Sequence, residues 1–314
     1  MRSDSGVDQA EGLRRLLVRN QTQVITVVAG KAGVGRTSTT INLAAALTRS
    51  GKDVLVLDEN HAPNNLLDCL GLVAKHDLLD VAQGKCFPRE ALLSAKGFSV
   101  LPTARAMHAL AALRPSFGQG VGGVAKLDRA QQQRLENALT EVSDGVDVML
   151  VDAAMLDGQA VVSSSLASGA ALLVVVDATA SGITESYALI KRLALENARL
   201  RFEIVVNKAV SAQAAMMVFD NMSKVARRNL SARLEYLGFI PSDERLKCAT
   251  QLGRSVVDAY PEAASAIACL ELAHKLLRLP VQQDESAVGI SGMMQSLIKH
   301  ITRQHSGEAT HVVN

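Results

Sequence analysis

Aromatic side chains are scarce in this sequence: Phe, Trp and Tyr make up 3% of the chain, and Trp is absent. Proteins that bind single-stranded nucleic acid without sequence preference stack the bases on aromatic rings, so the composition argues against that class. An excess of one charge is also lacking, because 33 basic and 31 acidic residues leave a net charge of +2. Specific DNA binding is therefore not expected.

Cysteine pairs and long apolar runs are absent as well. The four cysteines are Cys69, Cys86, Cys248 and Cys269, and none forms a C-x-x-C pair, so we expect buried free thiols. Residues 1–15 carry charges and no apolar core, unlike a signal peptide. No stretch approaches the roughly 18 apolar residues that span a bilayer. We therefore expect a reduced, cytoplasmic protein.

Apolar, β-branched runs alternate with segments of helical pattern along the chain. The runs cover residues 24–29, 53–58, 98–102, 146–152, 171–177, 202–207 and 235–241. They are nearly continuous in Val, Ile and Leu, which is typical of parallel strands buried on both faces. Helices are predicted over 37–50 (closed by Gly51), 183–200 and 214–232. The predicted fold class is α/β: a three-layer, mostly parallel P-loop NTPase sheet of about seven strands or more, flanked by helices.

A glycine-rich loop follows the first apolar run. Residues 30–37 match the phosphate-loop pattern G-x-x-x-x-G-K-[ST] at Gly30, Gly35 and Thr37. Glycines let the backbone curl so that its N–H groups face a phosphate, and the helix that follows adds its positive end. Thr37 is then the expected ligand of Mg²⁺. The alternative is a strand-to-helix turn that binds no ligand.

The same loop resembles the deviant loop K-G-G-x-G-K-[ST] of the MinD/ParA group of ATPases. Lys31 matches the signature lysine of that group, which in the family reaches across a dimer to the partner's nucleotide. Ala32 replaces one glycine, and Arg36 replaces the loop lysine. A planar guanidinium is not a conservative substitute at a tight phosphate site. The resemblance covers about residues 22–279 and implies ATP and Mg²⁺ as cofactors and an ATP-dependent homodimer.

Three more positions receive roles from this resemblance. Asp58 ends the second run near the metal, and Asn60 stands where the family has a water-positioning Asp. An amide orients water but cannot accept a proton as a carboxylate does. Asp152 ends its run as a Walker B carboxylate would. Arg36 and Asn60 together predict slow ATP hydrolysis, and a strand-end turn is the alternative role of Asp58.

The base-binding side of the site is predicted from two later segments. Asn207 and Lys208 end the 202–207 run, and Val210 stands where guanine-reading GTPases carry the Asp of N-K-x-D. The resemblance places Asn207 on adenine, with Pro241 and Asp243 beside the base. The predicted nucleotide-binding residues are Gly30, Lys31, Ala32, Gly33, Val34, Gly35, Arg36, Thr37, Ser38, Asn207, Pro241 and Asp243. The predicted catalytic residues are Lys31, Arg36, Asp58 and Asn60, and the predicted metal ligands are Thr37, Asp58 and Asp152.

The nucleotide-binding domain is predicted over residues 21–280, and residues 1–20 precede it. Residues 8–14 resemble the D-Q-A-x-x-L-R segment of the flagellar number regulators within the MinD/ParA group. In that family the segment stimulates a signal-recognition-particle-type flagellar GTPase. The predicted partner-binding residues are Asp8, Gln9, Ala10, Leu13 and Arg14. The alternative is a frayed amphipathic terminus.

Residues 281–314 comprise a polar linker and an amphipathic stretch. Its apolar residues recur at helical spacing: Ile290, Met293, Met294, Leu297, Ile298 and Ile301. This stripe is predicted to bind an anionic membrane surface, at the inner face of the cell membrane. The alternative is a helix docked on the protein's own surface.

The favoured hypothesis is an ATP-binding regulator of flagellar number and placement, acting as an ATP-dependent dimer with a flagellar GTPase partner. One alternative is a plasmid- or chromosome-partitioning ATPase, with Arg227, Arg228 and Arg233 as candidate contacts to DNA. Another is a non-hydrolysing ATP-dependent scaffold, which Arg36 and Asn60 favour. An electron-transfer relative with a bridging iron–sulfur cluster is disfavoured, because no Cys closely follows the 146–152 run.

Overall fold

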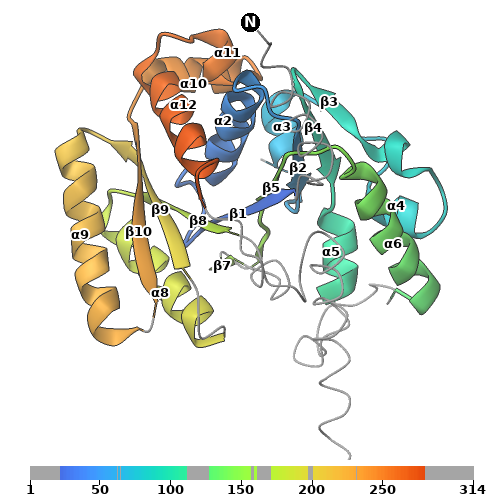
Figure 1. Cartoon of the computed structure of the whole chain (residues 1–314), viewed down its shortest axis with the longest axis horizontal. Coiled ribbons are helices and arrows are strands. Elements are labelled where there is room, and N and C mark those ends of the chain that lie inside the picture. The colour runs from blue at the N-terminus through green and yellow to red at the C-terminus, as the bar shows by residue number, and fades with distance from the viewer. Residues whose placement is uncertain are drawn as a thin grey trace, which may run out of the picture.

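The computed structural model describes residues 22–61, 63, 65–111, 127–156, 159–160, 171–196, 201–230 and 232–279. Its main sheet has eight strands (Figure 1). In spatial order they are β10 (Arg233–Pro241), β9 (Arg201–Ala209), β8 (Ala171–Asp177), β1 (Gln23–Ala29), β5 (Val148–Asp152), β2 (Val54–Asp58), β4 (Phe98–Pro102) and β3 (Leu93–Ala95). Every neighbouring pair is parallel except β3 and β4. The predicted mostly parallel sheet is therefore confirmed.

Helices cover both faces of this sheet (Figure 1). One face carries α2 (Arg36–Arg49), α3 (Leu66–Leu70), α10 (Glu244–Gln251), α11 (Val256–Ala259) and α12 (Ala264–Leu276). The opposite face carries α8 (Ala180–Glu196) and α9 (Ala212–Asn229) over β8–β10, and α4 (Leu78–Ala82), α5 (Ala104–Ala111) and α6 (Arg129–Val142) over β2, β4 and β5. The 3₁₀ helix η1 (Pro88–Ala91) packs beside α4 and α6 through the buried Ala91, and β6 (Met155–Leu156) and β7 (Gln159–Ala160) form a separate two-stranded sheet.

The continuous apolar runs of the strands follow from burial on both faces. In β8, Leu173 and Val175 pack with α2 and α12, whereas Leu172 and Val174 pack with α8 and α9. Successive side chains of a strand point to opposite faces, so a central strand needs apolar residues at every position. This pattern explains why continuous apolar runs in the sequence located the strands at the centre of the sheet.

Strand register brings the polar strand ends to one edge of the sheet. Asp58 of β2 pairs with Asp152 of β5, which also pairs with Val27 of β1. Asp177 of β8 pairs with Asn207 of β9. The loop between β1 and α2 leaves the sheet at this edge, because β1 lies between β5 and β8. In open α/β sheets ligands bind at such a switch point, beyond the carboxyl ends of the strands.

The boundaries of all three predicted helices differ slightly from the sequence predictions, and the helix predicted from residue 183 begins at Ala180. The helix after the loop begins at Arg36, one residue earlier than predicted, and Gly51 follows its end with φ 78°. The helix predicted over 214–232 ends at Asn229, because Leu230 is already extended toward β10. In the described part of the chain, no helix is long and apolar enough to cross a membrane.

Candidate functional site

The loop from Gly30 to Gly35 passes close to its neighbours at two glycines. A Cβ atom on Gly30 would lie 2.3 Å from backbone atoms of Glu185 and Ser186 in α8. Gly35 has φ 95°, and a Cβ there would lie 2.2 Å from Nδ2 of Asn207. Gly30 is therefore required because a side chain would collide with its neighbours. Gly35 is required for the same reason and also because its positive φ favours glycine.

Side chains from β9 hold the loop by its carbonyl groups. Nδ2 of Asn207 donates to the carbonyl oxygen of Val34 at 2.7 Å, and Nζ of Lys208 donates to that of Gly33 at 2.6 Å. In a trans peptide the N–H points opposite to the C=O. The N–H groups of these two peptide units therefore point away from β9, as a loop that receives an anion requires.

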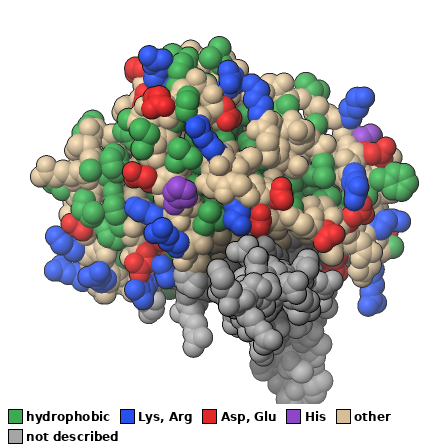
Figure 2. Space-filling view, turned by 45° about the horizontal axis from the view of Figure 1, so that its top comes forward, with side chains coloured by type: hydrophobic (Ala, Val, Ile, Leu, Met, Phe, Trp, Pro, Cys, Tyr) green, Lys and Arg blue, Asp and Glu red, His purple; other side chains and the backbone are tan. Residues whose placement is uncertain are grey.

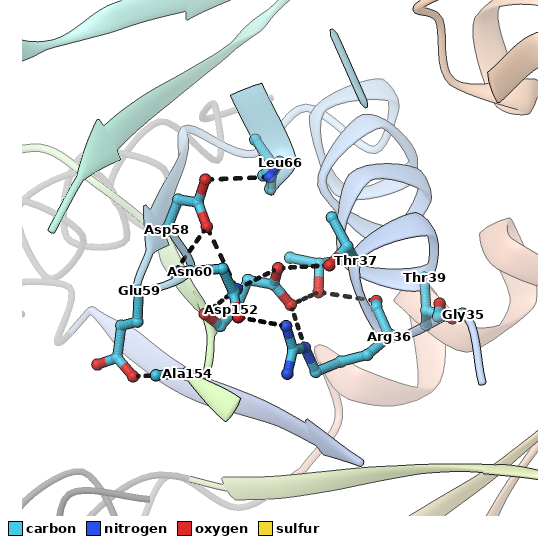
Figure 3. A network of polar contacts seen from close by, with 11 residues as sticks. Gly35, Arg36, Thr37, Thr39, Asp58, Glu59, Asn60, Leu66, Asp152 and Ala154 are labelled. Carbon is cyan, nitrogen blue, oxygen red and sulfur yellow. Dashed lines mark hydrogen bonds and ion pairs between the residues drawn. The ribbon is translucent and has the colours of Figure 1, made fainter. Parts of the chain in front are cut away.

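The side chain of Arg36 turns inward, toward the end of β5 (Figure 3). Its Nε donates to Oδ1 of Asp152 at 2.8 Å, and the two side chains are 9% and 0% exposed. Its Nη2 donates to Oδ1 of Asn60 at 2.6 Å. The loop arginine is thus a buried ion-pair partner of the predicted Walker B carboxylate.

The Asp152 carboxylate is fully engaged by protein donors. Oδ1 accepts from Arg36 and, at 3.3 Å, from Thr40. Oδ2 accepts from Oγ1 of Thr37 at 2.8 Å and from Nδ2 of Asn60 at 2.9 Å. A carboxylate has about four acceptor sites, so these contacts leave it little free capacity, and the single hydroxyl proton of Thr40 is shared with the carbonyl oxygen of Arg36 at 3.1 Å.

The two departures from the family pattern, Arg36 and Asn60, contact each other. The amide of Asn60 accepts from Arg36 through its oxygen and donates to Asp152 through its nitrogen. An ionised carboxylate at this position could accept but not donate. The arrangement therefore uses Asn60 as an amide bridge between a guanidinium and a carboxylate.

The predicted Mg²⁺ ligands, Thr37, Asp58 and Asp152, are already occupied by protein hydrogen bonds. Mg²⁺ needs free oxygen ligands at about 2.0–2.1 Å. Thr37 and Asp152 are hydrogen-bonded to each other, and Asp58 accepts from Asn60 and from the backbone N–H of Leu66. Within the described residues, no three His, Cys, Asp or Glu side chains form a metal site. As arranged, this donor set does not fit a metal ion at Asp152.

Two buried carboxyl groups next to this network bind protons more tightly than usual. Burial, with the nearby charge of Asp152, raises the pKa of Asp58 to about 6. Burial raises the pKa of Glu59 to about 7, although the N–H of Ala154 donates to it at 3.1 Å. Glu59 was not among the sequence-predicted site residues. The only signal was an acidic residue directly after a buried strand.

We expect the stability of the protein to fall between pH 5 and pH 8. A carboxyl group whose pKa is raised by folding stabilises the folded state below its unfolded value, and that contribution is lost as the pH passes its folded value. For Glu59 the pKa rises from 4.5 in the unfolded chain to about 7 in the folded protein. Glu59 therefore contributes about 3 kcal/mol to the fall in the free energy of unfolding. The Glu59→Gln variant should lose most of this fall, as measured by urea unfolding at both pH values.

The matched control for this measurement is Glu244→Gln, because Glu244 is an exposed residue whose ion pair is with the exposed Lys247 in α10. Its unfolding free energy should keep the wild-type dependence on pH. A Glu59→Gln protein that loses as much stability as the wild type over this interval would contradict the assignment.

Lys31 is held by residues of its own chain. Its Nζ donates to Oγ of Ser181 at 2.7 Å and to Oγ1 of Thr179 at 3.4 Å, and it lies 3.7 Å from the carboxylate of Asp177. The Lys31 side chain remains 30% exposed. A role in trans would require these contacts to exchange for contacts with a partner, and that role stays a prediction.

The residues predicted on the base side have structural partners. Asn207 holds the loop and also accepts from the N–H of Lys208 at 2.9 Å. Asp243 caps α10 through the N–H of Arg245 at 2.8 Å and accepts from Ser265 at 2.7 and 3.0 Å. Pro241 ends β10. Their contact with adenine stays a prediction.

Two predicted surfaces lie outside the described residues. These are the partner-binding segment at 8–14 and the apolar stripe at 290–301. Both therefore stay predictions.

Comparisons with known proteins agree with this geometry. Residues 25–256 match the family model described as the CobQ/CobB/MinD/ParA nucleotide binding domain. The chain is 36% identical over 260 residues to the antiactivator FleN of Pseudomonas aeruginosa, covering 82% of this chain and 88% of FleN. It is 27% identical over 250 residues to the septum site-determining protein MinD of Helicobacter pylori, covering 77% and 87%.

Among solved structures, the cell division ATPase MinD of Pyrococcus furiosus is similar with a TM-score of 0.59 and 26% identity. The match covers 82% of this chain and 99% of that protein.

Proposed function

Because the chain belongs to the CobQ/CobB/MinD/ParA nucleotide-binding family, we propose that it is an ATP-binding regulator of flagellar number and placement. It would act as an ATP-dependent dimer together with a signal-recognition-particle-type flagellar GTPase. The observation that supports this proposal most is the combination of the Lys31-containing loop with similarity to FleN over most of both chains. The family and its closeness to FleN confirm the resemblance drawn from the sequence.

The proposed ligand of the loop is ATP rather than GTP. Val210, 87% exposed, stands where a guanine-reading site carries Asp, so no carboxylate can bind the guanine N–H groups there. We expect ATP to bind at least about tenfold more tightly than GTP, since a missing hydrogen-bond partner is costly in a polar site. Titration of the full-length protein with fluorescently labelled ATP and GTP measures this ratio. Equal or tighter binding of GTP would refute the proposed adenine site.

Slow hydrolysis is part of the proposal. Asn60 lacks the carboxylate that the family uses to position water, and Arg36 is engaged with Asp152. The same two contacts favour the second candidate function, a non-hydrolysing ATP-dependent scaffold. The two candidates differ only in whether ATP is turned over, which single-turnover phosphate release distinguishes.

The partitioning alternative is less well supported. Lys and Arg side chains gather at the lower left of Figure 2, on the side where α9 lies in Figure 1, but acidic side chains lie among them. Arg227 and Arg228 are exposed in the last turn of α9, whereas Arg233 is paired with Glu235. Surface pairs of this kind reduce the positive field that non-specific DNA binding needs.

We also propose reversible membrane association through the stripe at 290–301, from a cytoplasmic pool. The stripe combines apolar residues with nearby Lys299 and Arg303. This composition suits binding in the plane of an anionic interface. Docking on the protein's own surface remains the alternative.

A further inference from the structure

We propose that Arg36 is a resident cation of the nucleotide site, which compensates Asp152 in place of a divalent metal and offers a free nitrogen to phosphate. ATP should then bind almost equally well with and without Mg²⁺. The inference rests on the proposed ATP site at residues 30–37. It is carried by two observations: the complete engagement of Asp152 by protein groups, and an unpartnered nitrogen on Arg36.

The first observation concerns charge and coordination. Asp152 is fully buried, and a buried carboxylate needs a compensating positive charge. Arg36 supplies that charge at 2.8 Å, and Thr37, Thr40 and Asn60 occupy the remaining acceptor sites. A divalent ion would have to displace these donors and would then lie beside a guanidinium of like charge. The single negative charge of Asp152 is thus already compensated by Arg36.

The second observation is an unsatisfied donor. Nη1 of Arg36 is buried and has no hydrogen-bond partner, although the side chain is 9% exposed overall. A buried donor without an acceptor is costly, and the cost is larger for a charged group. A phosphate oxygen is the acceptor that a guanidinium matches best. Arg36 is also the first residue of the long helix α2, whose positive end favours the same anion.

Asn60 orients the guanidinium for this role. It accepts from Nη2 at 2.6 Å while Asp152 accepts from Nε at 2.8 Å, which fixes the plane of the group through two of its nitrogens. Nη1 is then the guanidinium nitrogen that has no protein acceptor and is left for a ligand. A lysine has one nitrogen and a flexible stem, so it could not bridge both partners in a fixed plane. The role is therefore specific to arginine in combination with an amide at position 60.

The test is the affinity of the full-length protein for fluorescently labelled ATP, measured in excess Mg²⁺ and again in excess EDTA. We expect the two dissociation constants of the wild type to agree within about fivefold, because no metal has to bridge Asp152 and phosphate. A larger loss of affinity in EDTA would overturn the inference. Absence of binding in both solutions would instead refute the proposed ATP site, so the two failures are distinguishable.

Arg36→Lys should make binding depend on Mg²⁺ by more than about fivefold, because the ammonium cannot replace the planar bridge. The matched control is Arg49→Lys, the same exchange in the last turn of α2, where Arg49 donates to the carbonyl of Val257. That variant should keep the metal independence of the wild type. If Arg36→Lys also binds equally well in both solutions, Arg36 is not the cation responsible. Circular dichroism verifies that both variants are folded.

Discussion

The Arg36→Met variant should be about 3–5 kcal/mol less stable than the wild type, because the change leaves a buried carboxylate without its charge partner. Asp152 is fully buried and lies 2.8 Å from Nε of Arg36. Methionine approximates the volume of the lost side chain, so the loss of charge, and not a cavity, should dominate. Urea unfolding at pH 8 measures the effect.

Removing the second charge should recover more than half of this loss. In the Arg36→Met, Asp152→Asn double variant, no buried charge remains at the centre of the network. Replacing both partners of a buried ion pair typically costs less stability than removing one, because no uncompensated charge is left. The control is Arg89→Met, because Arg89 is 84% exposed and pairs with Glu141, which is 49% exposed. Exposed pairs contribute about 1 kcal/mol or less. An Arg36→Met protein no less stable than Arg89→Met would contradict the description of the site.

The full-length protein should accelerate GTP hydrolysis by the flagellar GTPase roughly tenfold or more, and a peptide of residues 1–20 should do the same. In this proposal Gln9 would orient water and Arg14 would stabilise charge on a transferring phosphoryl group, which are the two functions that a slow GTPase lacks. A segment this short is marginal as an isolated helix and would order on binding. Single-turnover GTP hydrolysis, with and without the peptide, measures the acceleration.

Gln9→Ala is the informative variant for the partner-binding segment. It should remove most of the acceleration and leave ATP binding at the loop unchanged, because the two sites are separate in the sequence. Glu11→Gln is a matched control, since Glu11 stands at one of the variable positions of D-Q-A-x-x-L-R. If neither peptide nor full-length protein accelerates the GTPase, residues 1–20 have no activating role, and the partitioning alternative gains support.

Much of the fold was predictable from the sequence, because burial on both faces leaves a local signature. The runs at 171–177 and 98–102 coincide with β8 and β4, and the loop at Gly30 follows β1 as predicted. The sheet also contains β3, the only antiparallel edge strand, which is three residues long. A strand this short carries too little periodicity to be recognised.

The interior of the site was less predictable, because its contacts join distant parts of the chain. Arg36 was predicted as a phosphate-loop residue, but its partners Asp152 and Asn60 lie 116 and 24 residues away. Asn60 was interpreted as a lost water-positioning group, and the structure shows what the amide does instead. Glu59 could not be singled out, since its raised pKa comes from burial by elements remote in sequence. The sequence shows that positions 36 and 60 differ from the family pattern. Only the fold shows that these two side chains contact each other.

We expect ATP to convert this protein into a dimer through Lys31. Nζ of Lys31 contacts Ser181 and Thr179 of its own chain, the side chain is 30% exposed, and we expect it to transfer to a partner's nucleotide. Sedimentation velocity of the full-length protein without nucleotide, with ADP and with ATP tests this directly. The wild type should be a dimer with ATP alone, and Lys31→Ala should be a monomer under all three conditions. A wild type that stays monomeric with ATP, or a Lys31→Ala protein that dimerises equally well, would contradict it.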